Sequence, residues 1–328
     1  MEWNLKKGFI TLLLFFASQS YGYQSNCDST FAFVDLLVWK LREGSADNWA
    51  QEISPDGAYK TADILQVPFH LNAGLRVGVG RNNNYNHWDT VFTYTWFQTK
   101  GSSQAYVATG GIYSPFVGNF YINNTNGSNF GPNYHNAGVQ WKLYYNIFDL
   151  ELGKKFNIDQ YLQLRPFIGL KGGFINQRID TQWQNPTIAT TFIAATENLK
   201  NDFAGIGPSV GINTTWPLYD RSKSSFKIVG NFSGALLWGH WSFSDLYENN
   251  TPASVAVNVE SINGAASMVR ALLGIEWSGL LLKKPMSIRL GYEAQVWFNQ
   301  VQYYSFNMGR LNNLMSLQGG VLGLCFYF

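Results

Sequence analysis

Apolar side chains recur at every second position through most of this chain, which is the pattern of β-strands that have two different faces. From Phe226 to Trp238 every even position is apolar or glycine, while Lys227 and Asn231 are among the odd ones. The stretch from Met286 to Phe298 shows the same alternation. The pattern predicts ten strands, at residues 30–41, 67–80, 87–99, 136–154, 161–178, 202–215, 224–242, 265–278, 286–299 and 315–328.

The connections between these segments are alternately long and short. The short ones are 81–86, 155–160, 216–223 and 279–285, and the long ones are 42–66, 100–135, 179–201, 243–264 and 300–314. Outer-membrane barrels have short periplasmic turns and longer extracellular loops. The sequence therefore predicts an all-β fold, a transmembrane antiparallel up-and-down β-barrel of about ten strands, with long extracellular loops and short periplasmic turns.

Composition argues against other classes. Only 13% of the residues are charged, against about 25% in soluble domains, and 16% are aromatic, which a disordered chain lacks. The mean hydropathy of −0.13 is too low for several apolar helices. A soluble β-sandwich would show the same alternation, but the expected strands are longer than its usual strands. Aromatic residues near the strand ends favour the interfacial girdles of a membrane barrel: Trp39, Trp88, Trp96, Trp141, Trp238, Trp277 and Tyr292.

Residues 1–22 have the layout of a secretory signal peptide, with Lys6 and Lys7 before the apolar run 9–17. The rest, residues 23–328, is expected to be a single barrel domain in the outer membrane of a Gram-negative bacterium. The last expected strand ends on Phe328, and its alternating apolar residues are similar to the signal read by barrel-assembly machinery: Leu324, Phe326 and Phe328. A net charge of +2 gives no basic excess that would indicate nucleic acid as a partner.

Six stretches spread over most of the chain form a further pattern: FVDLLVWK from Phe33, LNAGLRVGVG from Leu71, WDTVFTYTWF from Trp88, FDLELGKKF from Phe148, LRPFIGLKGGFINQ from Leu164 and GIGPSVG from Gly205. In their order and spacing they resemble the Legionella-type major outer membrane proteins, a family of pore-forming outer-membrane β-barrels. The resemblance implies an outer-membrane barrel and a pore. It carries over no catalytic motif.

If the apolar positions face lipid, the alternate positions line the lumen, and many of these are charged. The predicted lumen-lining residues are Asp35, Arg76, Asp89, Lys142, Arg165, Lys171, Lys227, Arg270, Glu276, Arg289 and Glu293. Asp149 and Glu151 are expected to join them after a β-bulge near Phe148 that switches the parity. Two interpretations stay open: the charges form the constriction of a pore, or they pair and fill a narrow interior. A count of ten strands does not decide between these interpretations. Barrels of about eight strands have no water channel, whereas barrels of 16 to 18 strands have one.

Cys27 and Cys325 lie on the first and last expected strands, which are neighbours in a closed barrel. Both are predicted to point inward at the periplasmic rim. We therefore expect a disulfide across the seam, which the oxidising periplasm permits, with two free buried thiols as the alternative.

Histidines raise the alternative of an enzyme, because omptin proteases are barrels of similar size that use Asp and His at the outer rim. His240 has Asp245 nearby, but it shares the parity of Trp238 on the lipid side. We expect interface or structural roles for all four: His70, His87, His135 and His240. The sequence thus predicts no enzyme, and no catalytic, cofactor-binding or metal-ligating residues.

The expected function is that of a porin, which allows passive diffusion of small hydrophilic solutes and ions. The alternative is a non-conducting structural or adhesin-type barrel that acts through its extracellular loops. The expected partners are outer-membrane lipid, the barrel-assembly machinery, small solutes or ions, and further copies of the chain in a homo-oligomer.

Overall fold

Nearly all described residues belong to strands of one antiparallel sheet. The computed structural model describes residues 29–44, 48–56, 59–83, 87–116, 133–187, 190, 192–221, 224–250, 254–281, 284–305 and 309–328. The strands are β1 (Ser29–Arg42), β2 (Asn48–Asp56), β3 (Tyr59–Gln66), β4 (Leu71–Asn83), β5 (Trp88–Tyr106), β6 (Gly111–Tyr113), β7 (Tyr134–Lys154), β8 (Phe156–Asn157), β9 (Gln163–Pro186), β10 (Ala194–Arg221), β11 (Ser224–Asn249), β12 (Ser254–Leu281), β13 (Lys284–Ser305) and β14 (Gly309–Tyr327). Within this part of the chain, no helix has the length and apolarity needed to cross a membrane.

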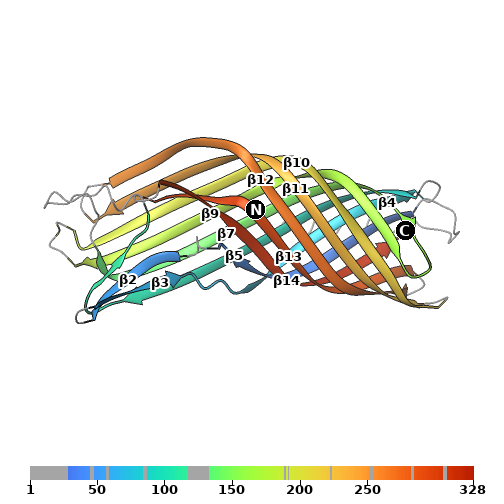
Figure 1. Ribbon diagram of the computed structural model, residues 1–328, viewed down its shortest axis with the longest axis horizontal. Coiled ribbons are helices and arrows are strands. Elements are labelled where there is room, and N and C mark those ends of the chain that lie inside the picture. The colour runs from blue at the N-terminus through green and yellow to red at the C-terminus, as the bar shows by residue number, and fades with distance from the viewer. Residues whose placement is uncertain are drawn as a thin grey trace, which may run out of the picture.

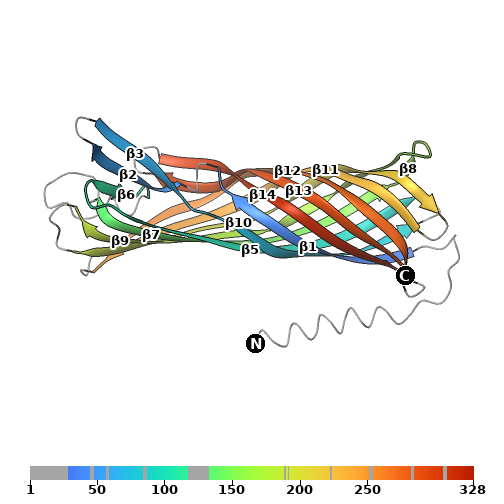
Figure 2. The same ribbon diagram turned by 90° about the horizontal axis from the view of Figure 1, so that it is seen from below.

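Ten strands close into a barrel, in the order β1, β4, β5, β7, β9, β10, β11, β12, β13 and β14. β1 pairs with β14 from Phe31 and Tyr327 to Arg42 and Ser316, which joins the two ends of the sheet. The start of β1 and the end of β14 therefore lie at one end of the barrel, which we call the inner end (Figures 1 and 2). The predicted ten-stranded antiparallel barrel is confirmed. The expected signal peptide, residues 1–22, lies outside the described residues.

The strands extend much further toward the outer end than predicted. β10 and β12 each have 28 residues, and they absorb much of the expected loops 179–201 and 243–264. In the outer part of β10 the polarity is reversed, because Leu199 and Phe203 are buried inside while Lys200 is exposed outside. This is the polarity of a strand whose outer face meets water. The alternation of lipid-facing apolar residues therefore predicts strands such as β10 and β12 to end too early at this side.

Short strands extend the wall at the outer end. β2 and β3 form a hairpin within the expected loop 42–66, and β6 pairs with both β2 and β7. Figure 2 shows all three at the end of the barrel away from the C-terminus. Trp49 of β2 is completely buried, with its ring 6.0 Å from that of Trp183 on β9. The hairpin thus contributes to a packed outer interior.

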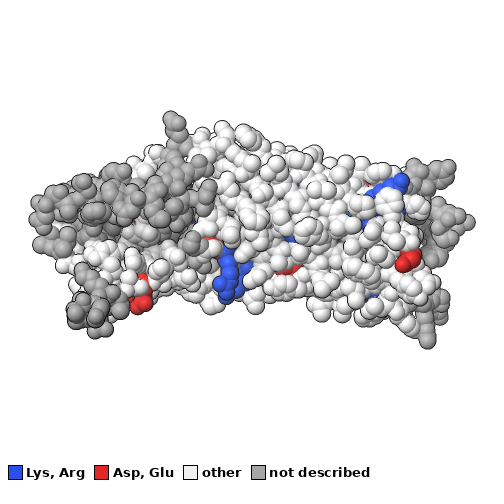
Figure 3. Space-filling model, viewed as in Figure 1, with Lys and Arg blue, Asp and Glu red and all other residues white. Residues whose placement is uncertain are grey.

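The outer face carries a belt of exposed apolar side chains that suits lipid. It includes Val79, Phe92, Leu150, Leu170, Ile206, Leu273, Leu290 and Leu322. Among the described residues on the face in Figure 3, most are uncharged. Trp88, Trp96, Trp238 and Tyr292 are exposed outward as expected for a girdle, and Trp277 is half-buried. The expectation was wrong for Trp39 and Trp141, which are buried inside the barrel.

Gly319 permits the closest approach at the seam between β1 and β14. It has φ of +155°, and a Cβ there would collide with the carbonyl oxygen of Val38. We expect Gly319→Ala to lose most of the folded, heat-modifiable species on a gel, because the seam cannot pair in register. Gly320→Ala is the matched control, since a Cβ at Gly320 meets nothing within 4 Å. Equal folded fractions for the two variants would contradict this role of Gly319.

Candidate functional site

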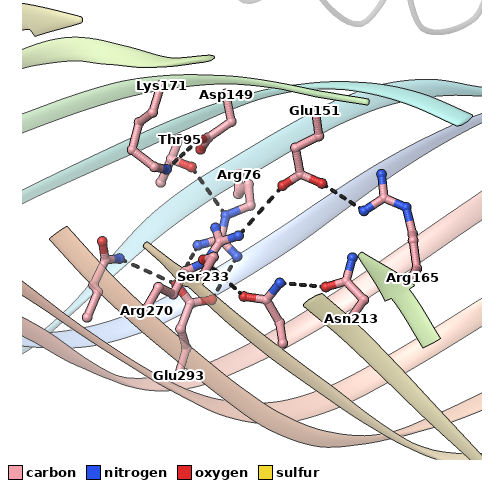
Figure 4. A network of polar contacts seen from close by, with 12 residues as sticks. Arg76, Thr95, Asp149, Glu151, Arg165, Lys171, Asn213, Ser233, Arg270 and Glu293 are labelled. Carbon is pink, nitrogen blue, oxygen red and sulfur yellow. Dashed lines mark hydrogen bonds and ion pairs between the residues drawn. The ribbon is translucent and has the colours of Figure 1, made fainter. Parts of the chain in front are cut away.

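Charged side chains from many strands converge in the inner half of the barrel interior (Figure 4). Twelve of the thirteen charged residues that were expected there face inward, six basic and six acidic. They are Asp35, Arg76, Asp89, Asp149, Glu151, Arg165, Lys171, Lys227, Arg270, Glu276, Arg289 and Glu293. Formal charge is therefore balanced among these residues, and each has an ion-pair partner within the set.

Arg76 of β4 is at the centre of the first half of this network. Its Nη1 and Nη2 donate to the two carboxylate oxygens of Glu293 on β13, at 2.8 and 2.7 Å. Its Nε donates to Thr95 Oγ1 at 3.2 Å, and Asp35 lies 3.5 Å from Nη1. Asp35 also accepts from Arg289 at 2.9 Å. The side chains of Arg76, Asp35 and Glu293 are at most 6% exposed, so these charges are held away from water.

The other half of the network lies along β5, β7 and β9 and reaches across to β12. Arg165 Nε donates to Asp89 Oδ1 at 2.8 Å, and its Nη1 donates to Glu151 at 2.9 Å. Arg270 of β12 lies 3.8 Å from Glu151 of β7, a strand on the far side of the barrel. Lys171 pairs with Asp149. Ion pairs therefore bridge the lumen as well as lining its wall.

Lys142 does not belong to this network, which corrects the sequence-based expectation. It points outward, 3.5 Å from Asp180, with its side chain 33% exposed. The expected β-bulge near Phe148 is also wrong, because β7 pairs with β5 and β9 without a register shift. Asp149 and Glu151 therefore share the inward parity of Trp141, and Lys142 has the opposite parity.

An aromatic layer crosses the lumen directly above the charges, on the side of the outer end. The ring of Tyr145 on β7 lies 6.4 Å from Trp39 of β1 and 6.0 Å from Trp297 of β13. Phe97 of β5 packs against Trp39 at 5.6 Å. All four side chains are at most 2% exposed. We call Trp39, Phe97, Tyr145 and Trp297 the aromatic layer.

Hydrogen bonds and a cation–π contact tie the aromatic layer to the charges. Tyr145 Oη donates to Gln295 Oε1 at 2.9 Å across the lumen, and Gln295 Nε2 lies 3.4 Å from Glu293. The Arg76 guanidinium lies 5.5 Å from the centroid of Trp39. This layer is not among the features predicted from the sequence. Trp39 is four residues after Asp35 on β1, so the two side chains point to the same side of the strand. The inward direction of Trp39 could therefore be predicted from this spacing alone.

The outer part of the interior is also packed. Its buried apolar side chains come from the barrel strands and from β2, among them Trp49, Trp141, Trp183, Leu199 and Phe243. The hydroxyls of Tyr134 and Tyr247 lie 3.2 Å apart there.

A polar cavity of about 300 Å³ lies in the inner half, below the aromatic layer. Its wall includes Asp89, Arg165, Asn231, Arg270 and Glu276. A polar space of this size has room for several water molecules. In the described part of the chain, no group of three His, Cys, Asp or Glu side chains could hold a metal ion.

The remaining expected residues lie at the strand ends or on the outer face. Cys325 is half-buried and faces inward, while Cys27 lies outside the described residues, so the disulfide stays a prediction. Leu324 and Phe326 face outward on β14, and the Phe328 nitrogen donates to the Thr30 oxygen at 2.8 Å. Their part in assembly also stays a prediction.

The histidines are not arranged as an acid–base pair with the nearby carboxylate. His240 is exposed on the outer face, where Nδ1 lies 2.9 Å from Asn263 Oδ1, whereas Asp245 is buried inside. His135 Nδ1 contacts the Val107 oxygen at 3.0 Å. His70 and His87 are exposed, and His87 is in a turn with φ of +58°.

The closed ten-stranded wall, its apolar belt and its charged interior define an outer-membrane β-barrel protein. Residues 27–328 match the family described as the Legionella pneumophila major outer membrane protein precursor. The chain belongs to this family, as the resemblance of its six sequence stretches had indicated, and its location is the bacterial outer membrane. A comparison with curated proteins finds no match.

Among solved structures, the chain is similar to the outer membrane protease OmpT from Escherichia coli, with 12% identity and a TM-score of 0.43 over 94% of this chain and 99% of that one. It is also similar to a Pseudomonas aeruginosa FadL homologue, with 7% identity and a TM-score of 0.28 over 92% and 90%. A third is the Pseudomonas putida toluene transporter TodX, with 6% identity and a TM-score of 0.25 over 93% and 90%.

Proposed function

We propose that this protein is a closed, structural outer-membrane barrel that displays its long outer extension at the cell surface. The observation that carries the proposal is the aromatic layer. Tyr145 contacts Trp39 on one side and Trp297 on the other, so side chains from β1, β7 and β13 meet inside the barrel. Aromatic side chains that meet across the lumen and are at most 2% exposed leave no continuous column of water.

The ion pairs below the layer support the same proposal. In an open constriction, charged side chains face water, but Arg76, Asp35 and Glu293 are nearly inaccessible and fully paired. Ten strands are close to the number at which side chains fill the interior. A structural role for the network follows more directly from this geometry than a role in ion selection.

The second candidate is a pore for small hydrophilic solutes and ions, with which the family resemblance agrees. The polar cavity of about 300 Å³ favours it, because this cavity is lined by charges of both signs. Conduction would require the aromatic layer and the outer packing to separate. Catalysis has no role in either candidate, and a homo-oligomer stays a prediction.

Planar-bilayer recording distinguishes the two candidates. We expect the refolded full chain, shown to be folded by heat modifiability, to give no single-channel steps at either polarity. A general porin in the same bilayers is the positive control. Steps whose ion selectivity changes in Arg270→Gln would overturn the closed barrel and support the pore, because Arg270 lines the inner cavity.

A further inference from the structure

Four basic residues form a continuous row on the outer face of β5, β7, β9 and β10. Lys100 is the cross-strand partner of Lys142, Lys142 of Arg178, and Arg178 of Lys200. We call these four residues the basic row. Adjacent strands are about 4.8 Å apart, so the row spans about 15 Å. Like charges directly opposite one another destabilise a sheet, which favours an anionic partner outside the chain.

The acidic neighbours neutralise only part of the row. Asp202 accepts from Arg178 at 2.6 Å, and Asp180 lies 3.5 Å from Lys142. For Lys100 and Lys200, which are exposed, the described residues provide no ion pair. Two formal positive charges therefore remain on this part of the outer face.

An apolar groove lies along the same strands, toward the inner end from the basic row. It has a volume of about 650 Å³, and its walls include Phe148, Phe174, Ile206 and Trp238. The groove is deep at Gly172, which is the cross-strand partner of both Phe148 and Ile206 and has no side chain to fill the space between them. The small side chain of Ala204 lies next to this position on β10. A second groove of about 820 Å³ adjoins it through the shared residues Leu150 and Leu170.

Polar side chains separate the row from the groove. Asn176 and Tyr144 form the next cross-strand pair after Arg178 and Lys142, and Asn146 follows on β7. From Arg178 to Phe174 the strand advances about 13 Å. A glycerol unit between phosphate and acyl chain is too short to cover this distance, whereas a phosphorylated sugar can contact the row with its phosphate and place its hydroxyls near the amides.

We infer that this face binds a phosphorylated glycolipid of the outer leaflet. The phosphate contacts the basic row, the sugar lies over Asn146 and Asn176, and an acyl chain occupies the groove above Gly172 and Ala204. Three features arranged along one direction of the wall carry this inference: unneutralised cations, a polar band, and an apolar groove that begins where the band ends. The site goes beyond the proposed structural function and does not depend on whether the lumen conducts.

Native mass spectrometry of the full chain in detergent micelles tests the site, with a diphosphorylated, acylated glucosamine disaccharide as the probe. We expect Lys100→Gln combined with Lys200→Gln to weaken binding about 25-fold, since each unneutralised cation near an anionic lipid contributes about five-fold. The matched control is Lys40→Gln combined with Lys154→Gln, which removes the same charge from outward positions elsewhere and is expected to leave binding within about two-fold of the wild type.

A groove variant tests the acyl contact separately. Ala204→Leu is expected to weaken binding of the acylated probe but not of the same disaccharide bisphosphate without acyl chains. Heat modifiability verifies that each variant is folded. Equal losses in the two lysine pairs, equal affinity for phosphatidylglycerol, or no effect of Ala204→Leu would each overturn the glycolipid site.

Discussion

Trp297→Ala is expected to lower the free energy of unfolding by about 3–5 kcal/mol, the usual cost of deleting a large aromatic side chain from a packed core. Trp297 is fully buried, and its ring lies 6.0 Å from Tyr145 in the aromatic layer. Its Nε1 also donates to Gln295 Oε1 at 3.3 Å. If Trp297 lined a water-filled channel, water would fill the space left by the alanine substitution. The free energy of unfolding would then decrease far less.

The matched control is Trp238→Ala, which removes the same side chain from the outer face, where Trp238 is 67% exposed. We expect a much smaller change for this variant, because detergent replaces the lost contacts. Urea unfolding of both variants in the same micelles, followed by tryptophan fluorescence, measures the difference. If the two variants are equally destabilised, the interior is not the packed core described above, and the pore candidate gains support.

Arg76→Met is expected to destabilise the barrel by about 3–5 kcal/mol, because it leaves buried carboxylates without their cation. Glu293 loses both of its bonds from the guanidinium and is only 1% exposed. Asp35 loses less, since Arg289 remains within 2.9 Å. Methionine keeps much of the side-chain volume, so the loss of charge is the main change.

The double variant Arg76→Met with Glu293→Gln separates charge from packing. We expect it to recover part of the stability, because no unpaired charge is then left at Glu293. Arg178→Met is the exposed control. Arg178 also makes two bonds to one carboxylate, that of Asp202, but its side chain is 30% exposed, so we expect a cost of at most about 1 kcal/mol. Equal effects of Arg76→Met and Arg178→Met in urea unfolding would contradict a buried, charge-paired network around Arg76.

The barrel could be predicted from the sequence because lipid imposes a simple rule on the outer face. Phe232, Leu236 and Trp238 alternate with inward residues, and each of the ten expected strands corresponds to one barrel strand. The rule applies only within the apolar belt. Beyond it, as in the outer part of β10, polar residues such as Lys200 face out and apolar ones such as Leu199 face in. The rule consequently predicts loops where the outer parts of strands such as β10 and β12 continue the wall.

Most of the charged interior could be predicted from the alternation of side-chain directions along each strand. The errors of this prediction come from the assumption that apolar side chains face lipid. The rule that apolar positions face lipid predicts an inward Lys142, and it then requires a change of parity near Phe148 to bring Asp149 inward. The uninterrupted pairing of β7 shows that there is no such change. The aromatic layer is not predicted from the sequence, because an aromatic ring near a strand end equally suits a membrane interface. Partners such as Arg76 with Glu293, which are 217 positions apart, depend on barrel closure and cannot be read from local sequence.

The seam between β1 and β14 has a consequence for biogenesis. Phe31 of β1 pairs with Tyr327 of β14. The first barrel strand therefore lacks one of its two hydrogen-bonding partners until the last strand has been synthesised. Until that partner arrives, β1 has an unsatisfied edge that can recruit other chains. Pairing across such a sequence separation is slow. The polypeptide must therefore be kept from aggregating during its transit across the periplasm, and a premature stop codon before β14 would yield an open, aggregation-prone sheet.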